Sequence, residues 1–137
     1  MADIESLVKR FLAAQNADDV DAIVNCYAAN GARVYGHGET RGRENLRALY
    51  KSVTGALTNR KMTVRKLTVA ERTAVLEYTE RATHSAPVKA QHGEIPASHA
   101  EIEIHGIAVL EYAGDEIAEA RVYSDALYQL LAKSKTR

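Results

Sequence analysis

The segment LEYTERATH, residues 76–84, combines a carboxylate with a guanidinium, a pair of groups that can move protons and stabilise charge. A carboxylate in an apolar cleft has a raised pKa and can serve as a general base. A guanidinium aimed at a developing oxyanion stabilises the transition state. Glu77 and Arg81 are therefore candidate catalytic residues. A structural ion pair between them is the alternative, because a buried charge without a partner is costly.

A histidine, His37, lies between two glycines in the stretch YGHGE. The glycines allow a tight backbone turn, and an imidazole titrates near neutral pH, so His37 is a third candidate for proton transfer. An exposed loop histidine is the alternative. The other four histidines follow no known spacing of metal ligands, so we expect neither a metal site nor a cofactor.

Helices are expected to come first along the chain. Apolar residues recur with helical periodicity in three segments, near residues 4–16, 19–29 and 43–55. Asp18 or Asp19 can cap the second helix, and Gly55 can end the third. A short strand at residues 33–35 separates the second helix from the third.

The rest of the chain alternates as strands do. Residues 62–69 change parity near Arg65, which predicts a β-bulge, and a second strand follows at residues 73–83. Residues 84–97 contain both prolines and form a candidate lid, since loops of this length are usually functional or disordered. Strands at 98–112 and 116–123 enclose a tight turn, and a last helix spans residues 124–133 with Ser124 or Asp125 as its cap.

The long hairpin shows which side chains face the interior. Its even positions are apolar, and several of them are small: Gly106, Ala108, Ala118 and Ala120. Small side chains beneath the helices leave an apolar hollow suited to a small hydrophobic molecule. Large helical side chains filling this space are the alternative. The fold class is therefore α+β, one domain over residues 1–137, with helices gathered on one face of a curved antiparallel sheet.

Composition narrows the class of function. The 137 residues include 18 basic and 18 acidic side chains, so no surplus of positive charge favours nucleic acid or an anionic membrane. Cys26 is the sole cysteine, which suits a reducing compartment. The sequence shows neither a membrane-length apolar run nor a secretory signal, so we expect a cytoplasmic protein.

Three longer stretches resemble a known family. FLAAQNADDVDAIVNCYAANGARV, TRGRENLRALY and GIAVLEYAGDEIAEARVYSD are similar to the SnoaL-like branch of the nuclear transport factor 2 superfamily, which also contains ketosteroid isomerases and limonene epoxide hydrolases. The resemblance covers residues 4–131. It implies a cone-shaped sheet wrapped around N-terminal helices, a short C-terminal helix, a deep pocket, and homodimers through the outer sheet face.

The catalytic residues of these relatives are mostly absent. The isomerase tyrosine and two aspartates fall on Phe11, Gly36 and Ala108, which cannot perform the same chemistry. The epoxide hydrolase arginine matches Arg81, but its aspartates fall on Thr83 and Val122. The cyclase aspartate also falls on Val122. If the matched arginine sets the register, Glu77 and Arg81 point inward; parity alone leaves this open, because the even positions 74–82 are as apolar.

The resemblance implies a pocket for a small apolar or polycyclic molecule. The chemistry would be cofactor-free proton transfer: isomerisation, cyclisation or dehydration. The missing aspartates favour the alternative, a non-catalytic ligand carrier or a dimeric partner-binding module, and a pocket filled by its own aromatic residues would favour the latter. The expected ligand-binding residues are Phe11, Tyr27, Val34, Gly36, Tyr50, Thr79, Thr83, Ile104, Gly106, Ala108, Ala120 and Val122.

Overall fold

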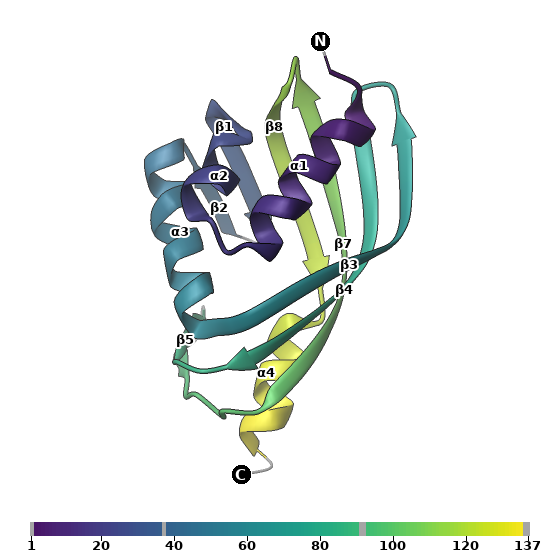
Figure 1. Ribbon diagram of the computed structural model, residues 1–137. Helices are drawn as coiled ribbons and strands as arrows, with labels where there is room; N and C mark the ends of the chain where they lie inside the picture. Colours follow the sequence, from purple (N-terminus) through teal and green to yellow (C-terminus); the bar gives the residue numbers. More distant parts are fainter. Residues whose placement is uncertain (1, 37, 91–92, 136–137) are drawn as a thin grey trace.

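The computed structural model describes residues 2–36, 38–90 and 93–135 (Figure 1). The helices are α1 (Ile4–Asn16), α2 (Val20–Asn25), α3 (Arg43–Ala56) and α4 (Ala126–Lys135). The strands are β1 (Tyr27–Tyr35), β2 (Gly38–Arg41), β3 (Leu57–Ala70), β4 (Thr73–His84), β5 (Val88–Ala90), β6 (Gly93–Ile95), β7 (Glu101–Ala113) and β8 (Glu116–Ser124).

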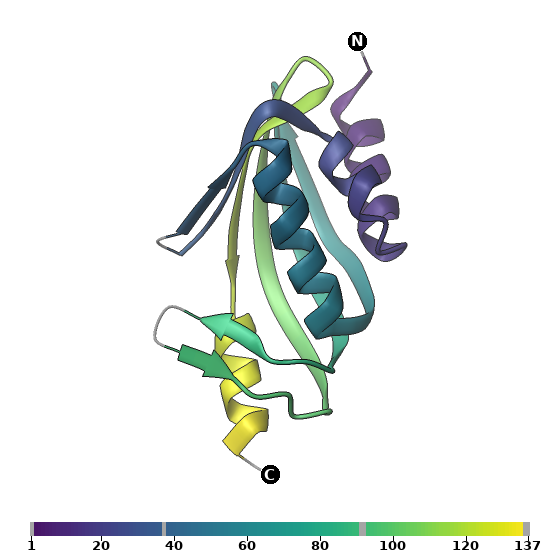
Figure 2. The same ribbon diagram turned by 90° about the vertical axis from the view of Figure 1, so that its left-hand side faces the viewer.

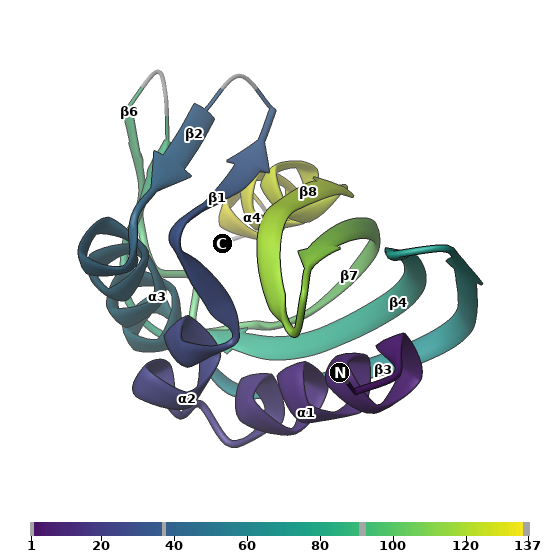
Figure 3. The ribbon, with the colours of Figure 1, turned by 90° about the horizontal axis from the view of Figure 1, so that it is seen from above.

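Six strands form one curved sheet in the order β2-β1-β8-β7-β4-β3, and β5 and β6 form a separate two-stranded sheet. Seen from above, the large sheet curls around the N-terminal helices (Figure 3). The predicted α+β class is confirmed, with one difference. The sheet is mixed rather than antiparallel, because β1 pairs parallel to β8.

Local sequence signals account for most helix ends. Asp3 caps α1 by accepting the amide of Ser6, and Asp19 caps α2 by accepting the amide of Ala22. The α3 helix has its predicted bounds within one residue. The α2 helix is shorter than expected, because Tyr27 already pairs with Ile117 of β8 and so begins a strand.

Two of the register shifts between paired strands bear on the predicted inward faces. The predicted bulge at Arg65 is confirmed: Val64 pairs with Tyr78 and Lys66 with Glu77. A second, unpredicted bulge lies in β8, where Glu111 pairs with Glu119 but Tyr112 with Ile117. It turns Ile117 into the core, so the prediction that Ala118 faces the interior is wrong.

The buried face of β4 is its even face. Ala74, Leu76, Tyr78, Glu80 and Ala82 are all at most 7% exposed. Glu77 and Arg81 are therefore on the outer face, and the inward register that the matched arginine implied is wrong. The physical reason is that side chains alternate between the two faces of a strand. One wrong choice of the buried face therefore misplaces every residue of the strand.

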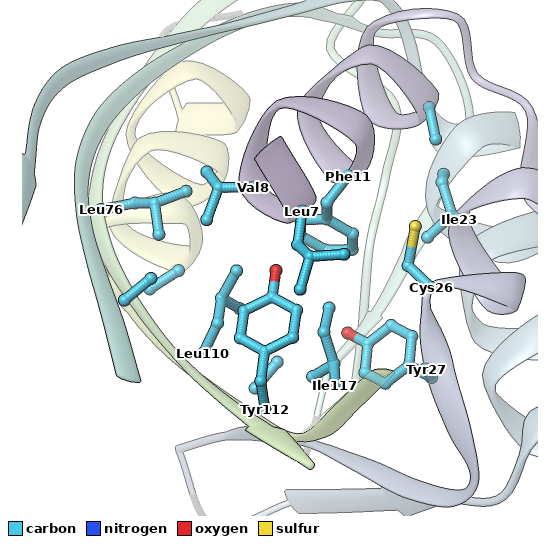
Figure 4. Packing of buried hydrophobic residues seen from close by; sticks show 14 of the residues in the cluster. Leu7, Val8, Phe11, Ile23, Cys26, Tyr27, Leu76, Leu110, Tyr112 and Ile117 are labelled. Atoms are coloured by element: carbon cyan, nitrogen blue, oxygen red, sulfur yellow. The ribbon is translucent and has the colours of Figure 1, made fainter. Parts of the chain in front are cut away.

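Apolar side chains gather in two clusters. The larger cluster joins α1, α2 and the inner sheet face; Figure 4 shows Leu7, Phe11, Tyr27, Leu110 and Ile117 within it. The smaller one lies at the other end and is formed by Leu57, Ala82, Ile95, Ile102, Ile104 and Leu130, with Val53, Val88 and Ala126 against it. The predicted loop at 84–97 thus contains a small hairpin, and its strand β6 lies beside α4.

Candidate functional site

The inner face of the sheet carries a floor of small side chains between two tyrosines. Reading across the strands, Tyr35 pairs with Val122, Val122 with Ala108, and Ala108 with Leu76. The next row runs from Ser124 through Gly106 to Tyr78. The expected small positions therefore do lie on the concave face.

Tyr78 fills the space that Gly106 was expected to leave. A Cβ added at Gly106 would lie 2.5 Å from the ring and hydroxyl atoms of Tyr78. An aromatic ring covering a glycine on the neighbouring strand is a known way to stabilise a sheet. The small residues that remain are Ala108 and Ala120, which are buried in the larger cluster, and the partly buried Val122 packs against them.

Arg33 is the central polar residue above this floor. Its guanidinium lies 5.5 Å from the ring centroid of Tyr35 and 5.9 Å from that of Tyr50, as in cation–π contacts. Within the described part of the chain, no hydrogen-bond acceptor or carboxylate pairs with it. A half-buried guanidinium with free N–H groups is suited to an oxygen of a bound molecule.

Two tyrosines flank Arg33, and a third, Tyr78, lies near enough for its pKa to respond to the Arg33 charge. Tyr50 Oη lies 2.8 Å from Tyr27 Oη, and Tyr35 Oη lies 3.2 Å from Ser124 Oγ. The Tyr78 hydroxyl finds no partner among the described residues. Burial raises the pKa of Tyr78, and the charge of Glu80 adds to this effect, so the phenol stays protonated and can donate. We call Arg33, Tyr35, Tyr50 and Tyr78 the arginine–tyrosine cluster.

Glu80 is the buried carboxylate beside this cluster. It lies two residues after Tyr78 on the same face, with its side chain 9% exposed and Oε2 3.5 Å from Nη1 of Arg60. Arg60 is held more closely by Asp18, at 3.0 Å. Burial raises the pKa of Glu80, and the charges of Arg60 and Arg33 oppose that rise. A buried carboxyl with a raised pKa is a candidate acid or base.

The sequence-predicted catalytic residues are not brought together at this site. Glu77 is exposed on the outer face. Arg81 lies there too, 65% exposed and 3.9–4.0 Å from Glu103 and Glu101. His37 lies outside the described residues.

The predicted ligand-binding residues divide between the two faces. Thr79 and Thr83 share the outer parity of Arg81, and Arg65 donates to Thr79 at 2.6 Å. Val34 pairs with Arg121, which bonds outer-face glutamates, so it also faces outward. Gly36 is exposed in the β1–β2 turn. The remaining eight face the interior: Phe11, Tyr27, Tyr50, Ile104, Gly106, Ala108, Ala120 and Val122.

Three of these interior residues pack on one another. Phe11 and Tyr27 stack edge to face at 6.0 Å, and the Tyr27 and Tyr50 rings lie 6.2 Å apart. Figure 4 shows Phe11 and Tyr27 within the apolar cluster. Phe11 and Tyr27 therefore belong to the core, and Tyr50 lies at its boundary with the arginine–tyrosine cluster.

Two hollows open on the surface, and neither of them is lined by the arginine–tyrosine cluster. A groove of about 320 Å³ on the outer sheet face is lined by Lys61, Thr63, Arg65, Thr79, Arg81 and Glu103. A shallow hollow of about 600 Å³ lies at the β7–β8 turn beside Arg10 and Asn25. Thr79 and Arg81 both line the groove, but on the outer face of the sheet. The hollow at the β7–β8 turn is lined by none of the predicted site residues.

Asp125 joins the last helix to the sheet. Its carboxylate accepts the backbone amide of His105 at 2.8 Å and the side-chain amide of Gln129 at 3.2 Å. The hydroxyl of Ser124 accepts the amide of Ala126 at 3.3 Å. Both residues therefore have structural roles. Ser124 bonds the first turn of α4, and Asp125 links α4 to β7.

Sequence reasoning missed Arg33, Tyr78 and Glu80 as functional candidates. Tyr78 and Glu80 were missed because the residue pattern of their strand does not show which of its two faces is buried. Arg33 was missed because its predicted strand pairs in parallel with the distant β8, and no local pattern shows which face it then occupies. Within residues 2–36, 38–90 and 93–135, no group of three or more acidic, histidine or cysteine side chains is placed to hold a metal ion.

A comparison with known proteins identifies a matching family. The model of the SnoaL-like domain family matches residues 8–120. No curated protein sequence matches the chain. In the described part of the chain, no helix is long and apolar enough to cross a membrane.

Many solved structures share the fold. A putative SnoaL-like polyketide cyclase from Jannaschia sp. CCS1 has a TM-score of 0.81 and 15% identity, covering 98% of this chain and 96% of that one. TsrD from Streptomyces laurentii has a TM-score of 0.79 and 23% identity over 95% and 98%. A hypothetical protein with a ketosteroid isomerase-like fold from Catenulispora acidiphila DSM 44928, in complex with trimethylamine, has a TM-score of 0.77 and 19% identity over 94% and 92%.

The architecture is thus an NTF2-like fold of the ketosteroid isomerase type. Since the family match spans most of the chain, the protein belongs to the SnoaL-like domain family.

Proposed function

We propose that the protein binds a small, mainly apolar molecule on the inner sheet face, with a polar oxygen of that molecule on the arginine–tyrosine cluster. The observation that carries this proposal is Arg33, which no acceptor among the described residues satisfies although two aromatic rings hold it in place. The apolar body would lie against Val122 and Ala108, with the more deeply buried Ala120 beneath them. The family match and the cyclase-like neighbours support a small-molecule site.

The chemistry that these groups support is cofactor-free proton transfer next to a carbonyl. Glu80 would take or return the proton, and Arg33 and Tyr78 would bind the oxygen on which charge develops. In this role Glu80 replaces Glu77, and Arg33 replaces Arg81. Arg60 and Asp18 would hold the Glu80 carboxylate in position.

A non-catalytic carrier or partner-binding module is the second candidate. Two observations favour it: Glu80 already has an ion-pair partner in Arg60, and Phe11, Tyr27 and Tyr50 fill part of the interior with their own rings. A carrier would share the binding role of Arg33 but would leave the protons of its ligand in place.

Binding can be tested with 2-naphthol, which has an apolar bicyclic body and one hydroxyl, by following its fluorescence. Replacing Arg33 with Leu removes charged hydrogen bonds worth about 1.5–3 kcal/mol, so binding should weaken roughly 10- to 100-fold. Arg81→Leu is the matched control and should bind as the wild type does. Equal binding by wild type and Arg33→Leu would refute the site.

Catalysis can be tested with 2-tetralone, a bicyclic ketone with acidic protons next to its carbonyl. Nuclear magnetic resonance in heavy water would follow exchange of those protons. We expect the wild type to accelerate exchange and Glu80→Gln to lose about 10²- to 10⁴-fold of that rate, as for other general bases. Glu77→Gln should keep the full rate. No acceleration by the wild type, with binding intact, would favour the carrier.

A further inference from the structure

The segment from Ser85 to Ala97 leaves the large sheet and returns to it at a narrow neck. At the neck, the His84 amide donates to the Ala100 carbonyl at 3.0 Å, and the His99 amide donates to the His84 carbonyl at 2.8 Å. Between these points the chain forms the β5–β6 hairpin (Figure 2). These two backbone hydrogen bonds therefore hold the two ends of the hairpin segment side by side.

The imidazole of His84 fills this neck. The residue is 0% exposed, and Nδ1 lies 3.4 Å from the backbone nitrogen and 3.4 Å from the hydroxyl of Ser98. A backbone amide can only donate, so Nδ1 accepts and the ring proton is on Nε2. Nε2 is buried and has no hydrogen-bond partner among the described residues.

Of the groups around His84, the Ala86 carbonyl favours a positive charge on the ring and His99 opposes one. The adjoining end of α3 and start of β3 present Ala56, Leu57 and Thr58, and the returning chain presents Ser98 and Ala100. The titratable group acting on the ring is His99. The charged side chains of the hairpin, Lys89 and Glu94, are exposed.

The pKa of His84 follows from this setting. Burial lowers the pKa from the ordinary 6.5, the Ala86 carbonyl opposes that change, and charge on His99 adds to the lowering. The unfolded state therefore binds a proton first as the pH falls. The stability of the closed neck is complete above about pH 6.5 and is lost as the pH falls below that value toward the folded-state pKa.

We propose that His84 is a pH-sensitive latch that holds the 85–97 segment closed when neutral and releases it when protonated. Protonation turns Nδ1 into a donor that faces the Ser98 amide, so two donors meet and the amide loses its acceptor. The added charge is fully buried beside an Nε2–H that already has no partner, which is a costly arrangement. Opening of the neck relieves both penalties.

Release of this segment would uncover one side of the candidate site, a consequence that rests on the proposed function. Val88 and Ile95 of the hairpin pack in the smaller apolar cluster with Val53 and Ile104. Val53 follows Tyr50 by one turn of α3, and Ile104 pairs directly with Glu80. The latch itself does not depend on what the site binds.

Hydrogen–deuterium exchange of residues 85–100, corrected for the intrinsic effect of pH, tests the latch. Between about pH 7.5 and pH 5.5, the wild type should lose protection by up to about tenfold, because pH 5.5 lies about one unit below the ordinary histidine pKa. His84→Gln offers a carbonyl acceptor to Ser98 but does not titrate, so its protection should not depend on pH. His99→Gln, the matched control, should keep the loss.

Constant protection in the wild type, or a persistent loss in His84→Gln, would overturn the latch. If His84→Gln does not fold, the imidazole nitrogen shifts of the wild type decide. They should show the Nε2–H tautomer near neutral pH and a titration that coincides with loss of the Ser98 amide signal. A normal titration with the Ser98 amide unchanged would also overturn it. Binding of 2-naphthol is measured separately, so a failed latch and a failed binding site remain distinguishable.

Discussion

Arg60 is a buried guanidinium that joins two carboxylates from different parts of the chain. It pairs with Asp18 after α1 and with Glu80 of β4, and its side chain is 6% exposed. Removing one partner of such a network leaves uncompensated charge in the interior, which typically costs about 3–5 kcal/mol. Arg60→Met should lower the free energy of unfolding by about that amount in urea titrations.

The exposed Arg81 provides the control for this measurement. Surface substitutions usually change stability by less than about 0.5 kcal/mol, so Arg81→Met should unfold almost as the wild type does. A loss below about 1 kcal/mol for Arg60→Met would show that the buried network adds little.

Gly106 and Tyr78 form the tightest contact of the site. A methyl group at Gly106 would meet the Tyr78 ring, whose far end can move. Gly106→Ala should therefore rotate the ring away from the sheet and cost about 1–3 kcal/mol, as overpacking does. A changed chemical environment of the Tyr78 ring protons would report the movement, and an unchanged spectrum with wild-type stability would contradict it.

At the scale of elements, the helix α4 depends on Asp125. Burial acts to raise the pKa of Asp125, but hydrogen bonds from the His105 amide, Gln129 and the His105 ring outweigh it, and the pKa lies below 3.8. A carboxyl with a lowered pKa contributes stability that is present above its unfolded value and lost as the pH falls through the folded value. The attachment of α4 should therefore weaken below about pH 4.

Asp125→Asn should remove most of this pH dependence while keeping an acceptor oxygen for His105. Helical signal from α4, measured by nuclear magnetic resonance at several pH values, would show the difference. Identical acid sensitivity of both proteins would assign the effect to other carboxyls.

Most elements could be predicted in order, apart from β2 and the β5–β6 hairpin, but the orientation of one strand could not. Helix periodicity, the Asp19 cap and the parity change at Arg65 each reflect local physics, and each was confirmed. In β4 both faces carry apolar and charged residues, so the period of two fits either register. The bulge at Ala118 and the ring of Tyr78 over Gly106 arise from pairing between strands, which no single stretch of sequence reveals.

The small residues on the inner sheet face were consequently predicted, but the polar groups of the candidate site were not. Ala108, Ala120 and Val122 lie where the hairpin pattern placed them. Arg33 acquires its role only because the parallel β1–β8 pairing carries it over the inner face, and a parallel pair far apart in sequence has no local signature.

At the scale of the whole molecule, we propose a homodimer through the outer sheet face. Charges of both signs alternate on that face: Arg81 lies beside Glu101 and Glu103, and Arg121 lies beside Glu111 and Glu119. Ile107 and Tyr123 pair between these regions and are 41% and 59% exposed. A second copy related by a two-fold axis would cover this apolar pair with the same pair of its partner.

Light scattering after size exclusion should give twice the chain mass of 15.0 kDa. Ile107→Asp should give the single-chain mass, because it places a charge at the centre of the interface. Val69→Asp is the control, since Val69 is equally exposed, at 44%, but lies near the end of β3. A wild-type monomer would contradict this assembly.

The most direct test of the central claim is where a bound probe lies relative to the sheet. Nuclear Overhauser contacts between the ring protons of 2-naphthol and protein methyl groups distinguish its two faces. We expect contacts to Ala108 and Val122 on the inner face. Contacts to Ile107 and Val109 on the outer face, with none to the inner methyl groups, would contradict the account.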